Sequence, residues 1–305
     1  MPYKKNSYVR RLKIILKRYL GVIYLCFGLV FLNSLILKLI FPDRKKLLIF
    51  MYHGIEEKKL NFDDNISMIN FKQQIYHLSH KFKIVSLHEA INYLKTDNCK
   101  TKKELAVLTF DDAYVGVYEN AYPLLNRMNI PATIFVPVNY VGKAGEWTRD
   151  EAGFNGEIMT WDMILELAKD PRITIGSHGM NHEKLSKLTE IQIKKELTDS
   201  KATLENKIGH EVRYFCYPWG QATECTSLIV RKLIEIRYHA ACSTIWGRFS
   251  SVRNIYALRR IGINYQDSMF DFELKINGAY DWLEILHLLK GFVLSRSARK
   301  EKRKK

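Results

Sequence analysis

The sequence has few cysteines, and their spacing suits neither a disulfide framework nor a thiolate metal knuckle. Its 305 residues include five cysteines, an odd number, and no Cys-x-x-Cys pair. This pattern argues against a small disulfide-bonded scaffold and against a Cys-ligated zinc knuckle. Proline is also sparse, with seven residues, and 47% of the chain is hydrophobic. The composition is therefore that of a globular protein with a large core, and it excludes a disordered or collagen-like chain.

Acidic residues are absent from the first 18 positions, which carry seven lysines and arginines. The last 16 positions hold eight bases and one acid, so the two ends account for most of the net charge of +16 and leave +2 for the 271 residues between them. Nucleic-acid binding needs basic side chains clustered on a folded face. This distribution argues against a nucleic-acid partner, and it favours contact of the ends with anionic membrane lipids.

Long polar stretches are missing from residues 19–42, which form the most hydrophobic part of the chain. As a helix, residues 20–41 would extend about 33 Å, enough to cross a bilayer core of about 30 Å. The excess of preceding bases predicts a single-pass N-terminal anchor with the remaining chain on the extracytoplasmic side. The alternative is a helix in the membrane interface, with the protein peripheral on the cytoplasmic face; residues 281–295 suit a second such helix.

Short apolar runs alternate with helical patterns throughout residues 43–280. Most of the runs lack period-2 alternation, which is typical of strands covered on both faces. Ser86-x-x-Glu89 and Thr189-x-x-Gln192 have the spacing of helix capping boxes. We therefore expect a basic segment (1–18), an anchor helix (19–42), one α/β domain (43–280), and an amphipathic helix with a basic tail (281–305). The expected strands lie at residues 46–52, 83–87, 105–111, 132–137, 173–177, 213–218 and 239–243.

Two of these strands end in side chains that are costly to bury without a partner. The run 105–110 leads into Asp111 and Asp112, and the run 173–177 leads into His178 and His182. Imidazoles four positions apart fall on one side of a helical turn and can bind one divalent ion together with a carboxylate from either aspartate. The alternatives are an aspartate helix cap and a solvated histidine pair. In an α/β fold the strand ends meet at one rim, which favours the metal site.

A third strand ends in the sharp turn Tyr217-Pro218-Trp219-Gly220. With it, three motifs occur in order, TFDD (109–112), SHGMNH (177–182) and FCYPWG (215–220). At these residues the chain resembles the polysaccharide deacetylase (NodB-homology) family, the family 4 carbohydrate esterases, in a Tyr-Pro branch similar to poly-N-acetylglucosamine deacetylases. The resemblance covers roughly residues 46–263.

The resemblance implies a distorted (β/α)7-type barrel, here preceded by one N-terminal hydrophobic helix. It implies metal-dependent hydrolysis of N-acetyl groups on an amino-sugar glycan, with release of acetate. Asp111 would be the catalytic base, and Asp112, His178 and His182 would bind a divalent metal, for which ligand type and family favour Zn²⁺. Tyr217 and Trp219 would contact the substrate, with the backbone amide of Trp219 at the oxyanion.

The chain departs from the family's pattern at several positions. Ala113 replaces a glycine after the aspartates, Gly179 replaces a serine or threonine, and Cys216 replaces an arginine that orients the base. The Leu-x-His motif that supplies the general acid has no counterpart near the end of the barrel. His53, after the first strand, is a candidate acid, with a structural hydrogen bond as the alternative. Arg260 is a candidate charge stabiliser, with a structural ion pair as the alternative.

Two other functions stay open. The first is a catalytically weak or inactive relative that binds glycans, which the missing Leu-x-His motif favours. The second is a cytoplasmic-face deacetylase of lipid-linked glycan precursors, which an interfacial helix over residues 20–41 would permit. The expected partners are an N-acetylated glycan and membrane lipids, without nucleic acid.

Overall fold

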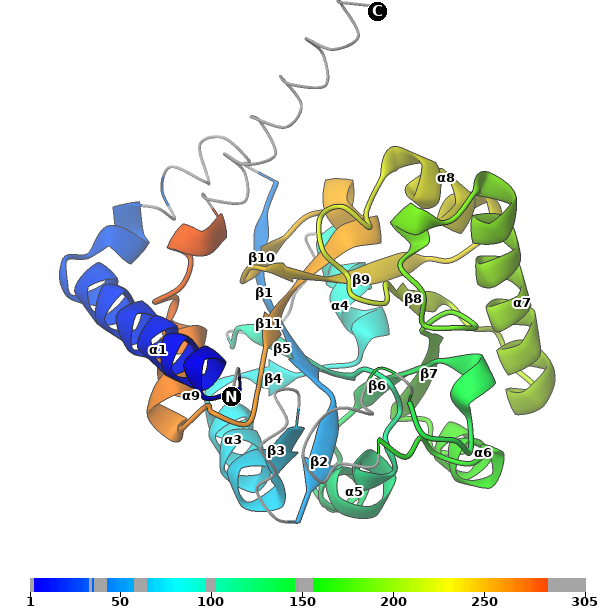
Figure 1. Cartoon of the computed structure of the whole chain (residues 1–305), viewed down its shortest axis with the longest axis horizontal. Coiled ribbons are helices and arrows are strands. Elements are labelled where there is room, and N and C mark those ends of the chain that lie inside the picture. Colours follow the sequence, from blue (N-terminus) through cyan, green and yellow to red (C-terminus); the bar gives the residue numbers. More distant parts are fainter. Residues whose placement is uncertain are drawn as a thin grey trace, which may run out of the picture. The chain divides into compact units, whose positions relative to one another are not determined.

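The computed structural model describes residues 3–32, 35, 43–57, 65–96, 103–145, 147 and 156–284. The chain divides into two compact units: residues 45–269 form one, and residues 1–44 together with 270–305 form the other. The first unit contains a closed barrel, and the motif residues all belong to it (Figure 1).

Seven parallel strands close the barrel in the order β1-β11-β9-β8-β7-β6-β5, and β5 pairs again with β1. The predicted (β/α)7-type barrel is therefore confirmed. All strands run in one direction, so their carboxyl ends share one rim, where enzymes of this architecture place their chemistry. The barrel strands are β1 (Lys45–Tyr52), β5 (Leu105–Phe110), β6 (Ala132–Val136), β7 (Ile173–Ser177), β8 (Tyr214–Cys216), β9 (Ala240–Trp246) and β11 (Leu258–Gly262).

Four short strands lie outside the closed ring. β4 (Lys83–Ile84) pairs with the outer edge of β5, and β10 (Phe249–Ser250) pairs antiparallel with the start of β1. β2 (Gly54–Glu56) and β3 (Asn65–Ser67) form a separate parallel pair. The predicted strand at 83–87 is thus an edge strand, and the seventh barrel strand is β11. Two adjacent arginines interrupt its apolar pattern, which is why the sequence did not predict it as a strand.

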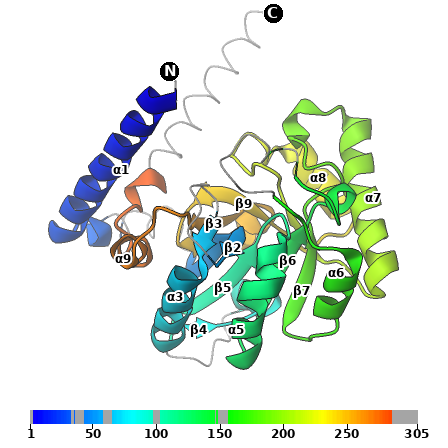
Figure 2. The same ribbon diagram turned by 60° about the horizontal axis from the view of Figure 1, so that its bottom comes forward.

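Helices connect the strands and pack on the outside of the barrel (Figure 2). Both predicted capping boxes are present, at Ser86 and Thr189, and the amphipathic helix after Thr189 buries Ile193, Leu197 and Leu204. The helices of this unit are α3 (Met68–Lys81), α4 (Leu87–Lys95), η1 (Val117–Ala121), α5 (Tyr122–Arg127), η2 (Val138–Tyr140), α6 (Trp161–Ala168), η4 (Leu185–Lys187), α7 (Glu190–Ile208), α8 (Ser227–Glu235) and η5 (Val252–Ala257).

The barrel interior is a packed core and not a pore. Its lower layers consist of buried apolar side chains such as Leu47, Val107 and Phe135, against which α4 packs with Leu87 and Ile91. Above them, at the carboxyl ends of the strands, the interior becomes polar. A small group of buried polar side chains therefore packs against the apolar layer of the barrel interior. Because this interior is close-packed, these side chains have little freedom to reorient.

The predicted membrane anchor is wrong. In the described part of the chain, no helix is both long enough and apolar enough to cross a membrane. Helix α1 runs from Tyr3 to Cys26, so it contains the basic segment and only the first eight positions of the hydrophobic run 19–42. Gly28, just beyond α1, has a left-handed φ of 62°, and residues 36–42 lie outside the described residues. The N-terminal hydrophobic helix is thus not confirmed in the predicted form.

In the same unit, Arg18 of α1 forms a bidentate ion pair with Asp271 of α9 (Met269–Asn277), with both contacts at 2.5 Å. One of the bases expected to face lipid head groups is therefore engaged with a carboxylate of its own unit. The predicted amphipathic helix and basic tail fall outside the described residues from position 285 onward.

Candidate active site

The turn after β5 directs two adjacent carboxylates to different places. The Asp111 side chain lies in the barrel interior, as does that of Thr109. The backbone N–H of Asp111 donates to the Tyr52 carbonyl. Asp112 and Ala113 then both adopt left-handed backbone conformations, with φ of 68° and 52°. Because this conformation is rare for residues with a Cβ atom, the surrounding structure must hold it. The turn swings Asp112 away from Asp111 and toward the segment after β7.

Asp112, His178 and His182 converge on one point. The Oδ1 atom of Asp112 lies 3.4 Å from Nε2 of His178 and 3.2 Å from Nε2 of His182, and all three side chains are buried. This Oδ1 atom accepts no hydrogen bond within the described part of the chain. A buried carboxylate oxygen facing two imidazole nitrogens fits a divalent cation, since the three ligand atoms lie within 4.8 Å of one another.

The protonation states of two of these side chains suit metal binding. Burial raises the pKa of the Asp112 carboxyl, but the neighbouring His182 and His178 outweigh burial and hold this pKa well below its usual value. Burial lowers the pKa of His182. Burial also lowers the pKa of His178, but Cys216, Asp112 and Asp111 outweigh burial and hold this pKa well above its usual value. An ionised carboxylate and a neutral imidazole are the forms in which these groups bind a metal.

A backbone carbonyl and a tryptophan side chain orient the three residues. The Nδ1–H group of His178 donates to the Cys216 carbonyl at 2.8 Å, which leaves Nε2 facing Asp112. Trp147 donates its indole N–H to Oδ2 of Asp112 at 3.3 Å and stacks on the His182 ring, with centroids 3.8 Å apart. Hydrogen bonds of this kind orient metal ligands and raise their affinity. Trp147 contacts two of the three, a role for which the sequence held no signal beyond an aromatic residue in a loop.

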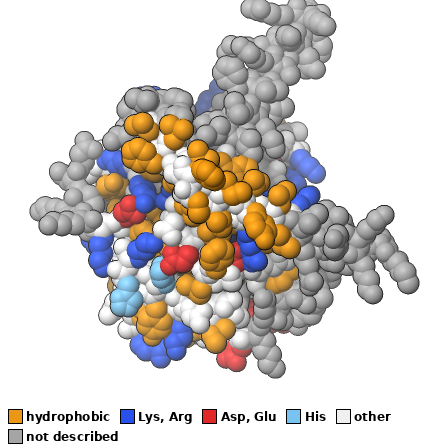
Figure 3. Space-filling model, turned by 90° about the vertical axis from the view of Figure 1, so that its left-hand side faces the viewer, with side chains coloured by type: hydrophobic (Ala, Val, Ile, Leu, Met, Phe, Trp, Pro, Cys, Tyr) orange, Lys and Arg blue, Asp and Glu red, His pale blue; other side chains and the backbone are white. Residues whose placement is uncertain are grey.

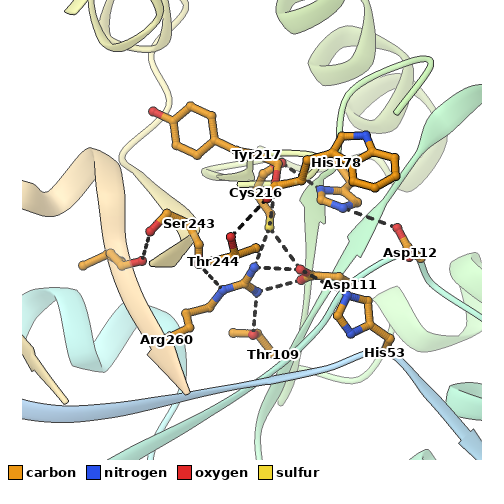
Figure 4. A network of polar contacts seen from close by, with 12 residues as sticks. His53, Thr109, Asp111, Asp112, His178, Cys216, Tyr217, Ser243, Thr244 and Arg260 are labelled. Atoms are coloured by element: carbon orange, nitrogen blue, oxygen red, sulfur yellow. Dashed lines mark hydrogen bonds and ion pairs between the residues drawn. The ribbon is translucent and has the colours of Figure 1, made fainter. Parts of the chain in front are cut away.

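Asp111 is held from the opposite side by Arg260 of β11 (Figure 4). The two terminal nitrogens of Arg260 donate to the two carboxylate oxygens of Asp111, each at 2.7 Å. The same guanidinium donates to the Thr109 hydroxyl at 3.0 Å and, through Nε, to the Ser243 carbonyl at 2.7 Å. Cys216 completes the group with its thiol 3.4 Å from Asp111. Arg260 therefore forms a buried ion pair with the carboxylate.

Burial and mutual contact determine the charges of Asp111, Cys216 and Arg260. Burial raises the pKa of Asp111, but Arg260 outweighs it, so the pKa lies below its ordinary value and the carboxylate is ionised. Burial raises the pKa of the Cys216 thiol to about 12, so the sulfur stays protonated. Arg260 is a permanent cation because burial, which disfavours its charge, is exceeded by the attraction of Asp111.

The turn after β8 brings Trp219 close to the three converging residues. Its ring centroid lies 5.7 Å from that of His182, and 46% of the residue is exposed. Trp219 has a left-handed φ of 63°, and its carbonyl accepts a hydrogen bond from Thr244. Tyr217 is fully buried, with its hydroxyl donating to the Tyr256 carbonyl and its amide donating to Cys242. The expected substrate contacts of both residues stay predictions.

His53, at the end of β1, lies at the same rim. Its Nε2 atom is 4.0 Å from Oδ2 of Asp111, and its buried Nδ1 atom has no hydrogen-bond partner among the described residues. The structure thus brings all of the predicted catalytic and ligand side chains, namely His53, Asp111, Asp112, His178, His182 and Arg260, to one end of the barrel.

The chain is similar to known proteins in sequence and in fold. Residues 98–236 match the family model described as polysaccharide deacetylase. The chain is 26% identical over 225 residues to YxkH of Bacillus subtilis (strain 168), a protein whose name is that of a polysaccharide deacetylase, and the match covers 72% of each chain. It is 28% identical over 192 residues to the poly-β-1,6-N-acetyl-D-glucosamine N-deacetylase of Staphylococcus aureus (strain MRSA252), covering 60% of this chain and 63% of the relative, less than two thirds of its length.

Solved structures show the same fold. The Streptococcus pyogenes deacetylase PplD superimposes with a TM-score of 0.62 at 22% identity, over 76% of this chain and 98% of PplD. IcaB from Ammonifex degensii gives a TM-score of 0.63 at 22% identity, over 74% of this chain and 95% of IcaB. Over residues 98–236 the chain is therefore similar to the polysaccharide deacetylase family.

Proposed function

We propose that this chain is a metal-dependent hydrolase that removes N-acetyl groups from the amino sugars of a glycan and releases acetate. One observation carries the proposal. A buried carboxylate oxygen of Asp112, without a hydrogen-bond donor among the described residues, faces the Nε2 atoms of His178 and His182, with a second buried carboxylate, Asp111, adjacent in the chain. These are a ligand set and a base, the two parts that hydrolysis of an unactivated amide requires.

Asp112, His178 and His182 would hold the cation. Two imidazole nitrogens and one carboxylate oxygen are a ligand set of catalytic zinc sites, and they leave positions for water and substrate. A bound divalent ion would lower the pKa of a water molecule and polarise the acetyl carbonyl. We propose zinc as the cation because of this set of donor atoms.

Asp111 is proposed as the base. Water adds to the acetyl carbonyl carbon, its proton passes to Asp111, and the C–N bond then breaks as the amine nitrogen gains a proton, so that acetate and the free amino sugar leave. Arg260 fixes both oxygens of Asp111, which limits the carboxylate to one orientation. A guanidinium does not release its proton. We therefore propose that Arg260 orients the base and stabilises charge, without acting as an acid.

The proton for the leaving amine needs a donor. His53 is the proposed acid because its Nε2 atom lies 4.0 Å from Asp111, where a proton taken from water could pass on. The backbone N–H of Trp219 is the proposed oxyanion contact, since it donates to no other group in the described part of the chain. A donor aimed at developing charge typically contributes about 10²–10³-fold to the rate of acyl transfer.

The proposed substrate is a polymer of N-acetylglucosamine. The support comes from the S. aureus relatives, whose printed name is poly-β-1,6-N-acetyl-D-glucosamine N-deacetylase. The alternative, a catalytically weak relative that binds glycans, is favoured by the absence of a Leu-x-His acid near the end of the barrel.

Acetate release separates the two functions. The full chain is incubated with β-1,6-linked N-acetylglucosamine oligomers, with added zinc and, in parallel, with a chelator. Acetate that appears with zinc and stops with the chelator supports the hydrolase. Binding of the oligomers without acetate release at any zinc concentration would replace the hydrolase with the glycan-binding function.

Contact with membrane lipids is proposed separately and without a spanning segment. Exposed apolar side chains of α1, such as Leu16, Tyr19 and Ile23, lie along the helix beside exposed Lys13 and Lys17. Figure 3 shows a face on which apolar side chains gather with lysine and arginine side chains nearby. This combination suits an anionic lipid surface. Co-sedimentation with anionic but not neutral vesicles tests it; the absence of a nucleic-acid partner stays a prediction.

A further inference from the structure

A buried carboxylate ties the loop between His178 and His182 to helix α7. Glu196 is 6% exposed. Its Oε1 atom accepts the backbone N–H groups of Met180 at 2.7 Å and Asn181 at 2.6 Å, and its Oε2 atom accepts the side-chain amide of Asn181 at 2.9 Å. Hydrogen bonds to an ionised acceptor are roughly twice as strong as neutral ones. Glu196 thus fixes the middle of the loop by three contacts.

The other side of this loop is held by the segment after β6. The backbone N–H of Val138 donates to the Gly179 carbonyl, and that of Asn139 donates to the Met180 carbonyl, at 3.0 and 2.9 Å. The Asn139 side chain also donates to the Asn181 side chain at 2.6 Å. The loop therefore has a fixed path between two supports, and Glu196 is the charged one.

The path of the loop decides where the second histidine points. His182 adopts a left-handed φ of 53°, which is unfavourable for a residue with a Cβ atom and persists only where the surroundings impose it. In this conformation its Nε2 atom lies 3.2 Å from Oδ1 of Asp112. Support of the loop by Glu196 is therefore also support of the ligand geometry.

Gly179 and Glu196 fit each other. Gly179 has a φ of 80°, and a Cβ atom at this position would lie 3.0 Å from Oε1 of Glu196. The glycine stands where the resembled family has a serine or threonine. In this chain the space beside that position is occupied by the carboxylate, which bonds the next two backbone amides.

We propose that Glu196 is a positioning residue of the metal site, which sets the spacing and direction of His178 and His182. The inference rests on the proposed function in one respect, the divalent cation between these side chains. Glu196 acts through the loop and contacts neither the cation nor the substrate.

The test is the zinc affinity of the Glu196→Gln variant of the full chain, measured against a competing chelator without substrate. A glutamine oxygen can accept the two backbone N–H groups, but its NH₂ group then faces the NH₂ group of Asn181, so one contact is lost. We expect zinc affinity to fall about 10–100-fold, the usual effect of removing a partner that orients a ligand. An affinity within twofold of wild type overturns the proposal.

The matched control is Glu205→Gln, nine positions further along α7. Oε1 of Glu205 also accepts a backbone N–H, that of Val212 at 2.9 Å, but about 13 Å further along the helix axis. Thermal unfolding of the metal-free proteins should show similar losses for both variants, while zinc affinity should fall for Glu196→Gln alone. Equal zinc losses in both would show a general effect of stability and overturn the proposal.

Asn181→Ala gives a second measurement should Glu196→Gln not fold. The Asn181 side chain is exposed, and its removal deletes the contact to Oε2 together with the contact from the Asn139 side chain. Asn139→Ala deletes only the second of these contacts and is the control. Zinc affinity that falls several-fold in Asn181→Ala but not in Asn139→Ala supports the proposal, and an affinity that is unchanged in Asn181→Ala, or that falls equally in both variants, overturns it. A wild-type chain that binds no zinc overturns the proposed metal site together with this inference, whereas wild-type binding with unaffected variants overturns this inference alone.

Discussion

The candidate site has two halves that differ in how closely they follow the family pattern. The metal half, Asp112 with His178 and His182, keeps every ligand that the resemblance implies. The base half, Asp111 with Cys216 and Arg260, has a thiol where the resemblance implies an arginine, and a guanidinium from another strand occupies the position beside the carboxylate.

The difference follows from what each half requires. A metal ligand must supply a particular atom at about 2 Å from the ion, so few residue types can replace it. A carboxylate needs only a fixed cation, and in a closed barrel that cation can come from any strand whose side chain reaches the interior. Arg260 reaches Asp111 from 149 positions away in the sequence.

Loss of a metal ligand should have the largest effect. In His178→Ala the chain loses one of three ligand atoms, so we expect zinc binding and deacetylation to disappear together, with activity lower by at least about 10³-fold. Zinc titration and acetate release measure the two. His210→Ala, a change at an exposed histidine, is the control and should leave both unchanged. Activity that survives in the His178 variant would contradict the ligand role.

Asp111→Asn should separate the halves. The amide cannot take a proton from water, so kcat should fall roughly 10²–10⁴-fold, the usual contribution of a general base. The three proposed ligands remain, so zinc affinity should stay near the wild-type value. If zinc affinity falls as steeply as kcat, Asp111 belongs to the metal half and the division of the site is wrong.

Arg260→Lys tests whether the base needs a bidentate partner. Lysine keeps the charge but cannot donate two parallel hydrogen bonds to Asp111. We expect kcat to fall about tenfold with zinc affinity unchanged, and the free energy of unfolding to fall by about 1–3 kcal/mol because a buried hydrogen bond to a charged group is lost. Kinetics and urea unfolding measure both effects, with Arg259→Lys as the control on the same strand. An unchanged kcat would show that the ion pair of Arg260 with Asp111 is structural only.

Much of the fold could be predicted from the sequence because strands buried on both faces leave uninterrupted apolar runs. β11 was missed since Arg259 and Arg260 break its run, and the burial of Arg260 depends on Asp111, far away in the sequence. The membrane anchor was predicted from the hydrophobic run 19–42 and from the bases before it, but the helix begins at Tyr3 and includes the basic segment. A hydropathy pattern does not show where a helix begins or ends.

The convergence of the proposed metal ligands could be predicted because their spacing is local: two histidines lie four positions apart, and two aspartates are adjacent. The roles of Trp147 and Glu196 could not be predicted, because each comes from an element without a motif. Trp147 contacts Asp112 and His182, and Glu196 contacts the loop between His178 and His182, only after the barrel has closed. Side chains that orient ligands carry no sequence signature of their own, since many residue types can donate or accept one hydrogen bond.

Trp147→Phe should give the smallest effect and sharpens the comparison within the metal half. Phenylalanine can still stack on His182, but it has no N–H for Oδ2 of Asp112 or for the Tyr114 hydroxyl, so both hydrogen bonds are lost and the stacking remains. We expect zinc affinity to fall by about tenfold, the lower end for a partner that orients a ligand. Trp161→Phe, on α6 beneath Lys207, is the control. If the Trp147 variant binds zinc as tightly as wild type, Asp112 is oriented by its turn alone, and the left-handed backbone at Asp112 and Ala113 suffices to place it.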